Sequence, residues 1–344
     1  MRVLITGVAG HLGSKLAEWI RENRPAVEII GVDDLSSGFR ENVPRGVQFI
    51  WENLSESAEC IRAAGRLDAV FHFASFAAEC LSPFVRRHTI QRVWLPTATV
   101  LNAILTGPGC SRLVLASSAA VYGAGRAPFD ERSHCLPHDP YGVAKLACEH
   151  DVRIAGEQHG LDWCVVRPHN IYGPGQSLWQ EHRNVFGIWM RAALEGRPLQ
   201  VFGDGRQRRA FSYVDDILPA LWEAGTAPEA SRQTINLGGS LPTSILGAAE
   251  LAAGILGASA IEHVPGRHEV RESYCTTERS EALLGYRDQT TLRDGLARMW
   301  EWAREVWRRW PERAAGNPGG QSVELEVRKG LPAVWREVSR ATQS

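Results

Sequence analysis

Ser118, Tyr141 and Lys145 are the residues whose types and spacing best suit proton transfer. Ser117 and Ser118 end the apolar run LVLASS, and Tyr141 and Lys145 follow in PYGVAK. Tyr141 and Lys145 are four residues apart, so on a helix their side chains share a face. A free tyrosine titrates at about pH 10, but a nearby ammonium stabilises the phenolate and lowers that pKa. Ser118 could then relay a proton between Tyr141 and a substrate hydroxyl.

This spacing alone is weak evidence for a catalytic pair, because any exposed helix can show it. A glycine motif at the start of the chain supports the interpretation. An apolar run at 2–6 leads into Gly7, Gly10 and Gly13, and a helical pattern follows. Glycines allow a tight turn and close approach to a pyrophosphate, and a helix N-terminus offers N–H groups to phosphates. A glycine triplet also suits a plain turn, but its place between a strand and a helix favours a dinucleotide site.

Asp33 ends the second apolar run, where a carboxylate would meet the adenosine ribose. It can accept hydrogen bonds from both ribose hydroxyls and repels a 2′-phosphate, which favours NAD over NADP. An oxidised nicotinamide would further stabilise a Tyr141 phenolate, and Lys145 could hold the nicotinamide ribose. The adjacent Asp34 also suits a solvated turn.

Short apolar runs alternate with helical patterns in the first half of the chain, at 2–6, 28–33, 47–51, 69–74, 112–117 and 163–168. Continuous apolar runs are typical of strands buried on both faces, and the segments between them are long enough for crossover helices. We therefore predict an α/β fold with a doubly wound parallel sheet of the Rossmann type. Ser118 follows the fifth run, at the sheet edge where ligands bind. Pro96 should kink or break the helix expected at 84–106.

After residue 170 the rhythm changes, with helical patterns at 184–196, 214–224, 243–256 and 292–311. We expect an NAD-binding domain with the catalytic residues at 1–170. A smaller C-terminal substrate-binding lobe at 171–344 should be partly interleaved with it. Trp300, Trp307 and Trp310 lie near one face of the last pattern, as in an amphipathic helix that caps the core or, alternatively, binds a partner.

The 344 residues include 38 basic and 39 acidic side chains, a formal net charge of −1. This balance does not favour a nucleic acid or an anionic membrane as partner, and no apolar run approaches the ~18 residues of a membrane helix. Seven scattered cysteines and the absence of a signal-peptide pattern indicate reduced thiols in the cytoplasm. The candidate ligands His134, Cys135, His138 and Asp139 lack the spacing of a tetrahedral site, so we expect no metal.

Longer phrases resemble the extended short-chain dehydrogenase/reductase family, specifically its NAD-dependent nucleotide-sugar epimerases and dehydratases, and most closely the UDP-glucose 4-epimerases. They are TGVAGHLG, VDDLSSG, FHFAS, SSAAVYG, DPYGVAK, RPHNIYGPGQ, FGDGRQRRAFSYVDD and INLGG, and they span nearly the whole chain. The resemblance implies bound NAD, a nucleotide sugar of the UDP-hexose type as substrate, and a homodimer. It also makes Ser118 the active hydroxyl residue.

The resemblance further implies which residues hold the ligands. The NAD contacts would be Gly7, Gly10, His11, Leu12, Gly13, Asp33, Asp34, Asn53, Leu54, Phe73, Ala74, Ser75, Ser117, Tyr141, Lys145 and Pro168. The nucleotide-sugar contacts would be Ser118, Tyr141, Asn170, Asn184, Arg209 and Arg267. An arginine fork suits a pyrophosphate, although an arginine in a basic run is often only solvated. The two asparagines could instead form turns or helix caps.

Three positions near these sites need comment. Related enzymes often have Asp at the place of Asn53, where it holds the adenine amino group, and an Asn can still accept a hydrogen bond from that group. Related enzymes also often have Asn at the place of Val93, which leaves open how the side chains pack around the helix that carries Tyr141. We expect His72 to be a buried, hydrogen-bonded histidine without a direct role.

Ala119 and Ala120 follow Ser118 where related 4,6-dehydratases carry Asp and Glu and related decarboxylases carry a Glu. A methyl group can neither abstract nor donate a proton. The resemblance then favours 4-epimerisation: Tyr141 takes the hydroxyl proton, C4 is transiently oxidised by NAD, the keto sugar rotates and the hydride returns. The alternatives are a dehydratase, a decarboxylase, a dehydrogenase that releases NADH, and a non-catalytic NAD-binding scaffold.

Overall fold

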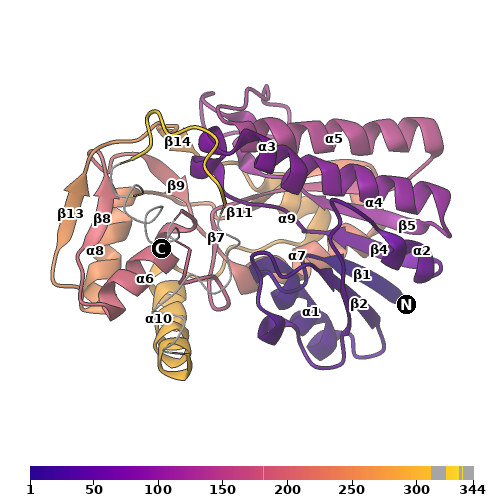
Figure 1. Cartoon of the computed structure of the whole chain (residues 1–344), viewed down its shortest axis with the longest axis horizontal. Coiled ribbons are helices and arrows are strands. Elements are labelled where there is room, and N and C mark those ends of the chain that lie inside the picture. The colour runs from indigo at the N-terminus through magenta and orange to yellow at the C-terminus, as the bar shows by residue number, and fades with distance from the viewer. Residues whose placement is uncertain (181, 311–322, 333–334, 336–344) are drawn as a thin grey trace.

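A seven-stranded sheet forms the centre of the computed structural model, which describes residues 1–180, 182–310, 323–332 and 335 (Figure 1). The strand order is β11-β6-β5-β4-β1-β2-β3, and every neighbouring pair runs parallel. The strands are β1 Arg2–Thr6, β2 Glu28–Asp33, β3 Gln48–Trp51, β4 Leu67–His72, β5 Cys110–Ala116, β6 Trp163–His169 and β11 Gln233–Gly238. The predicted doubly wound parallel sheet is confirmed.

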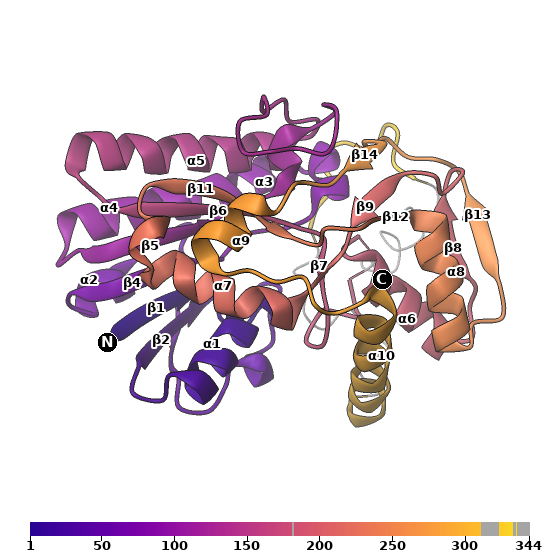
Figure 2. The ribbon, with the colours of Figure 1, turned by 180° about the vertical axis from the view of Figure 1, so that it is seen from behind.

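Helices cover both faces of this sheet, because successive strand residues point to opposite sides and both sides are apolar. Val3, Ile5 and Phe71 belong to the core on one face, and Leu4 and Val70 belong to the core on the other. The first face is covered by α1 His11–Asn23, α7 Val214–Thr226 and α9 Glu278–Leu284; the second by α2 Glu59–Ala63, α4 Leu95–Thr106 and α5 Pro140–His159 (Figures 1 and 2).

The fourth predicted strand ends two residues early. The run at 69–74 was expected to stay extended, but β4 stops at His72. The N–H groups of Phe73 and Ala74 both donate to the Thr6 hydroxyl at 3.1 Å. The chain therefore turns over the end of β1 instead of continuing the ladder.

Pro96 interrupts the helix around it as predicted. The chain runs through α3 Arg86–Thr89, then a π-helical turn at Ile90–Trp94, and α4 begins with Pro96 in its first turn. A proline has no N–H group and is tolerated there. Val93 is buried, and its carbonyl accepts from the Thr97 hydroxyl and the Cys148 thiol. The backbone of the π-helical turn is thus linked to both α4 and α5.

The second half of the chain adds a smaller lobe with its own core, at the left of Figure 1. Its helices are α6 Val185–Leu194, α8 Ile245–Leu256 and α10 Leu292–Arg309. Its strands form the pair β8 Leu199–Phe202 with β13 Ile261–Val264, and the sheet β12 Pro242–Ser244, β9 Arg208–Ala210 and β14 Glu272–Ser273. The short strands β7 Ile171–Tyr172 and β10 Ser212–Tyr213 pair where the chain leaves the large sheet.

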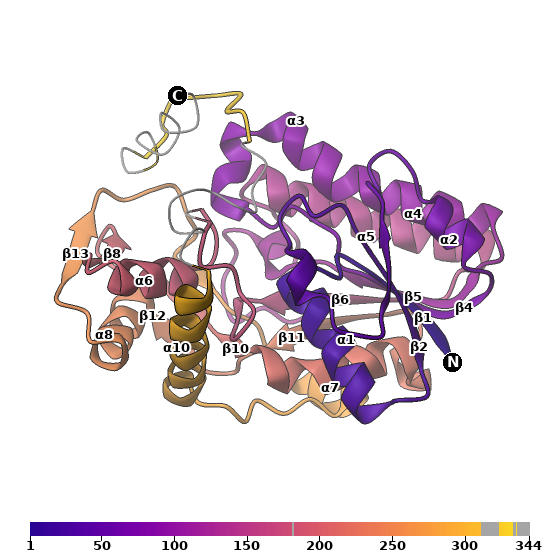
Figure 3. The ribbon, with the colours of Figure 1, turned by 60° about the horizontal axis from the view of Figure 1, so that its bottom comes forward.

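Helix α10 packs across this lobe, as Figure 3 shows. Trp300 and Trp307 contact the lobe's core, and Trp307 stacks on Trp179 with 5.5 Å between ring centroids. Trp310 lies at the C-terminal cap. The predicted amphipathic helix that caps the core is confirmed.

Three predicted absences can be compared with the described part of the chain. None of its helices is long and apolar enough to cross a membrane. All seven cysteines are free thiols. Within the same residues, no three His, Cys, Asp or Glu side chains gather as metal ligands.

Candidate active site

The glycine turn between β1 and α1 approaches other backbone too closely for any side chain. Gly7 has φ +71°, and a Cβ there would lie 2.8 Å from the Ala74 nitrogen. A Cβ on Gly13 would lie 2.2 Å from the Gly7 oxygen. Gly10 precedes α1 without a side-chain cap, so no side chain of the cap covers the helix N-terminus. This geometry suits a pyrophosphate.

Asp33 is buried at the end of β2 with its carboxylate fixed by backbone. It accepts from Ala9 N at 2.9 Å and from Leu35 N at 2.8 Å, while burial raises its pKa. Each carboxylate oxygen keeps a second lone pair for a ribose hydroxyl.

The neighbouring predicted contacts are engaged with protein atoms. Asp34 forms an ion pair with Arg92, 2.5 Å between atoms, and Asn53 accepts from both Ser55 N and Arg92. The predicted adenine contact of Asn53 would therefore share an oxygen with two donors.

Ser118, Tyr141 and Lys145 come together at the carboxyl end of β5. Tyr141 and Lys145 lie on α5, whose first turn is capped by Asp139. Lys145 Nζ donates to Ala116 O at 2.7 Å and lies 5.9 Å from the centroid of the Tyr141 ring. Ser118 follows β5 and hydrogen-bonds with Tyr141. The three predicted catalytic side chains thus form one cluster.

Burial favours the neutral form of both ionisable groups in this cluster. It raises the pKa of Tyr141, which the Ser118 hydrogen bond opposes, and it lowers the pKa of Lys145. A positive charge beside Tyr141 would move its pKa back towards neutrality.

Ser117 faces away from this cluster into a buried ionic network that the sequence did not reveal. Its hydroxyl donates to Glu149 Oε1 at 2.5 Å. Arg167 contacts both oxygens of Glu149, at 2.8 and 2.7 Å, and Arg153 adds a contact at 2.9 Å. Because Glu149 lies one turn beyond Lys145, the network fixes α5 to β5 and β6.

His72 is the satisfied buried histidine that we expected. Its two ring nitrogens contact the hydroxyls of Thr6 at 2.8 Å and Thr97 at 3.0 Å. Burial and the charge of Lys145 lower its pKa to about 3, so it is neutral.

The two arginines predicted to hold a pyrophosphate meet at one carboxylate. Arg209 on β9 and Arg267 contact the same Glu269 oxygen at 3.3 and 3.5 Å. The Arg267 guanidinium also lies over the Phe202 ring, 4.3 Å from its centroid, and its buried Nε has no hydrogen-bond partner among the described residues.

The two predicted asparagines occupy strained turns. Asn170 has φ +46° and donates to Ala210 O at 3.1 Å. Asn184 has φ +51° and precedes α6 with an exposed side chain and no side-chain cap. Its amide does not serve as the helix cap that was the alternative role.

Two charged residues near Tyr141 escaped the sequence reasoning. Glu79 is close to Asp139, Arg209 and Arg267, and burial and Asp139 raise its pKa to about 7. Arg183 lies over the Phe76 ring with a buried Nη2 that has no hydrogen-bond partner in the described structure; burial lowers its pKa to about 10. No spacing rule marks either residue, because their neighbours come from other elements.

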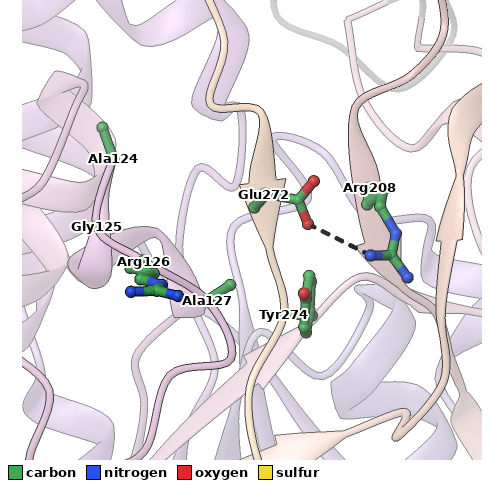
Figure 4. Close-up of a pocket in the computed structure, with 7 residues that line it drawn as sticks. All are labelled: Ala124, Gly125, Arg126, Ala127, Arg208, Glu272 and Tyr274. Carbon is green, nitrogen blue, oxygen red and sulfur yellow. Dashed lines mark ion pairs between the residues drawn. The ribbon is translucent and has the colours of Figure 1, made fainter.

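A separate hollow of about 550 Å³ lies between the 124–127 loop and strands β9 and β14 (Figure 4). It is lined by Arg208, Glu272 and Tyr274, with Arg208 and Glu272 3.9 Å apart. None of the predicted site residues lines it.

Known proteins are similar to this chain in sequence and in fold. The model of the NAD dependent epimerase/dehydratase family matches residues 3–238. This chain belongs to that family. It is 30% identical over 319 residues to UDP-glucose 4-epimerase of Mycolicibacterium smegmatis, which covers 88% of this chain and 99% of that one.

Two solved structures resemble this epimerase/dehydratase closely. UDP-glucose 4-epimerase of Thermotoga maritima with UDP-glucose has a TM-score of 0.83 and 27% identity, covering 89% of this chain and 99% of its own. UDP-glucose 4-epimerase of Thermus thermophilus with NAD has a TM-score of 0.81 and 27% identity, covering 88% and 99%. Other relatives are a UDP-glucuronate 4-epimerase, a decarboxylase and a 4,6-dehydratase. This epimerase/dehydratase is thus NAD-dependent and belongs to a family that acts on nucleotide sugars.

The residues of this epimerase/dehydratase fit NAD. His11 Nε2 and Ser75 Oγ are buried near the glycine turn without a hydrogen-bond partner among the described residues. Buried polar atoms are nearly always hydrogen-bonded, so these two are free to bind a ligand. Burial and Lys15 lower the pKa of His11 to about 4, so its ring is neutral at pH 7. The NAD contacts of Leu54, Phe73, Ala74 and Pro168 stay predictions from the sequence.

Proposed function

We propose that this protein inverts C4 of a UDP-activated hexose of the glucose/galactose type. The observation that carries the proposal is the cluster of Ser118, Tyr141 and Lys145 beside Ala119 and Ala120. These two alanines are buried and start a short helical turn behind Ser118. The immediate neighbours of the active hydroxyl therefore supply no acid or base for removing water or carbon dioxide.

When bound, NAD takes up and returns the hydride of C4. Tyr141 removes the proton of the 4-hydroxyl, and Ser118 bridges the two oxygens by a hydrogen bond. Lys145, held on Ala116 O, keeps its ammonium beside the Tyr141 ring. Arg209 and Arg267 hold the pyrophosphate while the keto sugar turns over. C4 then presents its opposite face to the returning hydride, and Tyr141 gives its proton back to the 4-oxygen.

Glu79 supports a second candidate, a lyase of the same family. It brings a carboxyl with a pKa of about 7 to the neighbourhood of Tyr141. Such a group could replace the acid that Ala119 and Ala120 lack. A dehydratase or decarboxylase is therefore the alternative that the experiment must separate.

The test is to incubate the purified protein with UDP-hexoses, without added NAD, and to follow the sugar protons by NMR. An equilibrium mixture of C4 epimers is expected, because NAD remains bound. A 4-keto-6-deoxy or pentose product would refute the epimerase and favour the lyase.

Replacing Tyr141 by Phe provides the matching test of catalysis. We expect turnover to fall about 10²–10⁴-fold, the usual contribution of a positioned acid–base group. UDP binding, measured by calorimetry, should change little. If Tyr141→Phe turned over as fast as the wild type, Tyr141 would have no part in the mechanism. If the wild type itself bound UDP but turned over no UDP-hexose, the non-catalytic NAD-binding scaffold would be favoured.

We further propose that residues 171–344 mainly hold the nucleotide sugar. A homodimer and a cytoplasmic location also remain proposals, which sedimentation and cell fractionation would test.

A further inference from the structure

A segment after α10 returns to both lobes. We call residues 323–332 together with Trp335 the strap; it is drawn in yellow in Figures 1 and 3, where it runs beside α3 and across to the smaller lobe. Val323 and Leu325 pack on an apolar cluster of the larger lobe.

The strap is hydrogen-bonded to the larger lobe at Glu326. The N–H groups of Glu326 and Val327 donate to Phe84 O at 2.9 and 3.2 Å. The Glu326 carboxylate accepts from the N–H groups of Arg87 at 3.0 Å and His88 at 3.1 Å, at the start of α3. These contacts form a defined anchor.

The other end of the strap is buried against the predicted substrate residues. Trp335 is 5% exposed. Its ring centroid lies 6.2 Å from that of Phe202, 4.8 Å from that of His182 and 5.9 Å from the Arg267 guanidinium. An aromatic ring and a cation thus face it from the smaller lobe.

A cavity of about 140 Å³ remains between the strap and the smaller lobe. Phe202 and the segment 264–268 line one side, and Gly330 and Pro332 of the strap line the other. Pockets for whole ligands usually measure about 300–1,000 Å³. This cavity is therefore sized for one small ring rather than for a complete nucleotide sugar.

We propose that the strap is the outer wall of the pocket for the nucleotide base, and that it makes this pocket selective for a pyrimidine. Aromatic and cationic side chains bind flat rings by stacking. Arg267 lines this cavity, and Arg209 contacts the same Glu269 oxygen as Arg267. Both arginines suit the attached diphosphate. The inference rests on the proposed function, which supplies the nucleotide.

The test compares the binding of UDP and ADP to the full-length NAD-bound protein by calorimetry. We expect the wild type to prefer UDP. Trp335→Ala should weaken UDP binding about 10-fold or more, the loss typical of a buried aromatic anchor, with a smaller effect on ADP. Trp335→Phe should restore most of the UDP affinity.

Two further variants distinguish a specific effect of the strap on UDP binding from a general loss of folded structure. Glu326→Gln weakens the anchor and should lower UDP affinity in the same direction. Glu324→Gln makes the same chemical change at an exposed position of the same segment, outside the anchor, and should leave the affinity unchanged. Thermal unfolding of each variant checks that the fold persists.

Each outcome decides between the proposals. Tighter UDP binding in Trp335→Ala would refute the proposal that the strap is a wall of the pocket, and would show that Trp335 competes with the nucleotide. Unchanged UDP binding in both Trp335→Ala and Glu326→Gln, with normal epimerisation, would refute the strap's role alone. A wild type that neither binds UDP nor turns over UDP-hexoses would refute the proposed function and the base pocket together.

Discussion

At the scale of single residues, Tyr141 is placed for proton transfer, but its surroundings do not favour the phenolate form. Burial keeps the phenol neutral, and Glu79 and Asp139 add to this effect when ionised. Ser118 and Arg183 oppose it. The balance of these charges determines the pH at which Tyr141 becomes a base.

Glu79→Gln should make Tyr141 a better base. A carboxylate near Tyr141 raises its pKa, so removing that charge should shift the acid limb of kcat/KM to lower pH. A pH–rate profile of both proteins measures this shift. An identical acid limb would mean that Glu79 does not face the reacting tyrosine.

Stability offers an independent check of Glu79. Its folded pKa of about 7 exceeds the usual 4.5, so the folded protein binds more protons between these values and loses stability as the pH rises through them. Glu79→Gln should therefore raise Tm more at pH 8 than at pH 5. The exposed Glu229→Gln is the control, and the same difference there would contradict the assignment.

At the scale of elements, helix α5 carries the catalytic pair and is held by charge as well as by apolar packing. Burial alone would raise the pKa of Glu149, but Arg167, Ser117 and Arg153 outweigh it and hold that pKa below its usual value. The contribution of Glu149 to stability is thus present at neutral pH and is lost as the pH falls into the acid range.

Glu149→Gln should destabilise the protein by about 3–5 kcal/mol, because it leaves the Arg167 charge buried without its partner. Urea unfolding at pH 7 measures the loss. Glu157→Gln, an exposed change on the same helix, should cost little. Equal effects of the two substitutions would show that the network contributes nothing specific.

The elements differed in how far the sequence predicted them. Central strands such as β1 and β5 were predictable because a strand buried on both faces is a continuous apolar run. Edge strand β11 contains Gln233 and Asn236 and shows no such run. The glycine turn and the catalytic trio were predictable because their spacing is local.

The remaining parts of the site depend on contacts between distant segments. Arg183 approaches Tyr141 from the turn before α6, and Glu326 binds backbone more than 200 residues upstream. No periodicity or propensity encodes such pairs. The charges around the site and the strap therefore became visible only in the folded chain.

At the scale of the whole molecule, nucleotide binding should stabilise both lobes together. A ligand at about 100 times its Kd adds about 2.7 kcal/mol to the free energy of unfolding. We expect UDP at that concentration to raise Tm, and Arg267→Ala to abolish most of the rise at the same UDP concentration. An undiminished rise would exclude Arg267 from the nucleotide site.

The strap also affects how the molecule is completed during synthesis. Trp335 packs on Phe84 and Phe202, which belong to different lobes and leave the ribosome long before it. Domains fold as units in the order in which they are made. A nascent chain therefore passes through a stage in which the lobes are folded but Trp335 is not yet available. The proposed base pocket is then still open on the side that the strap later closes.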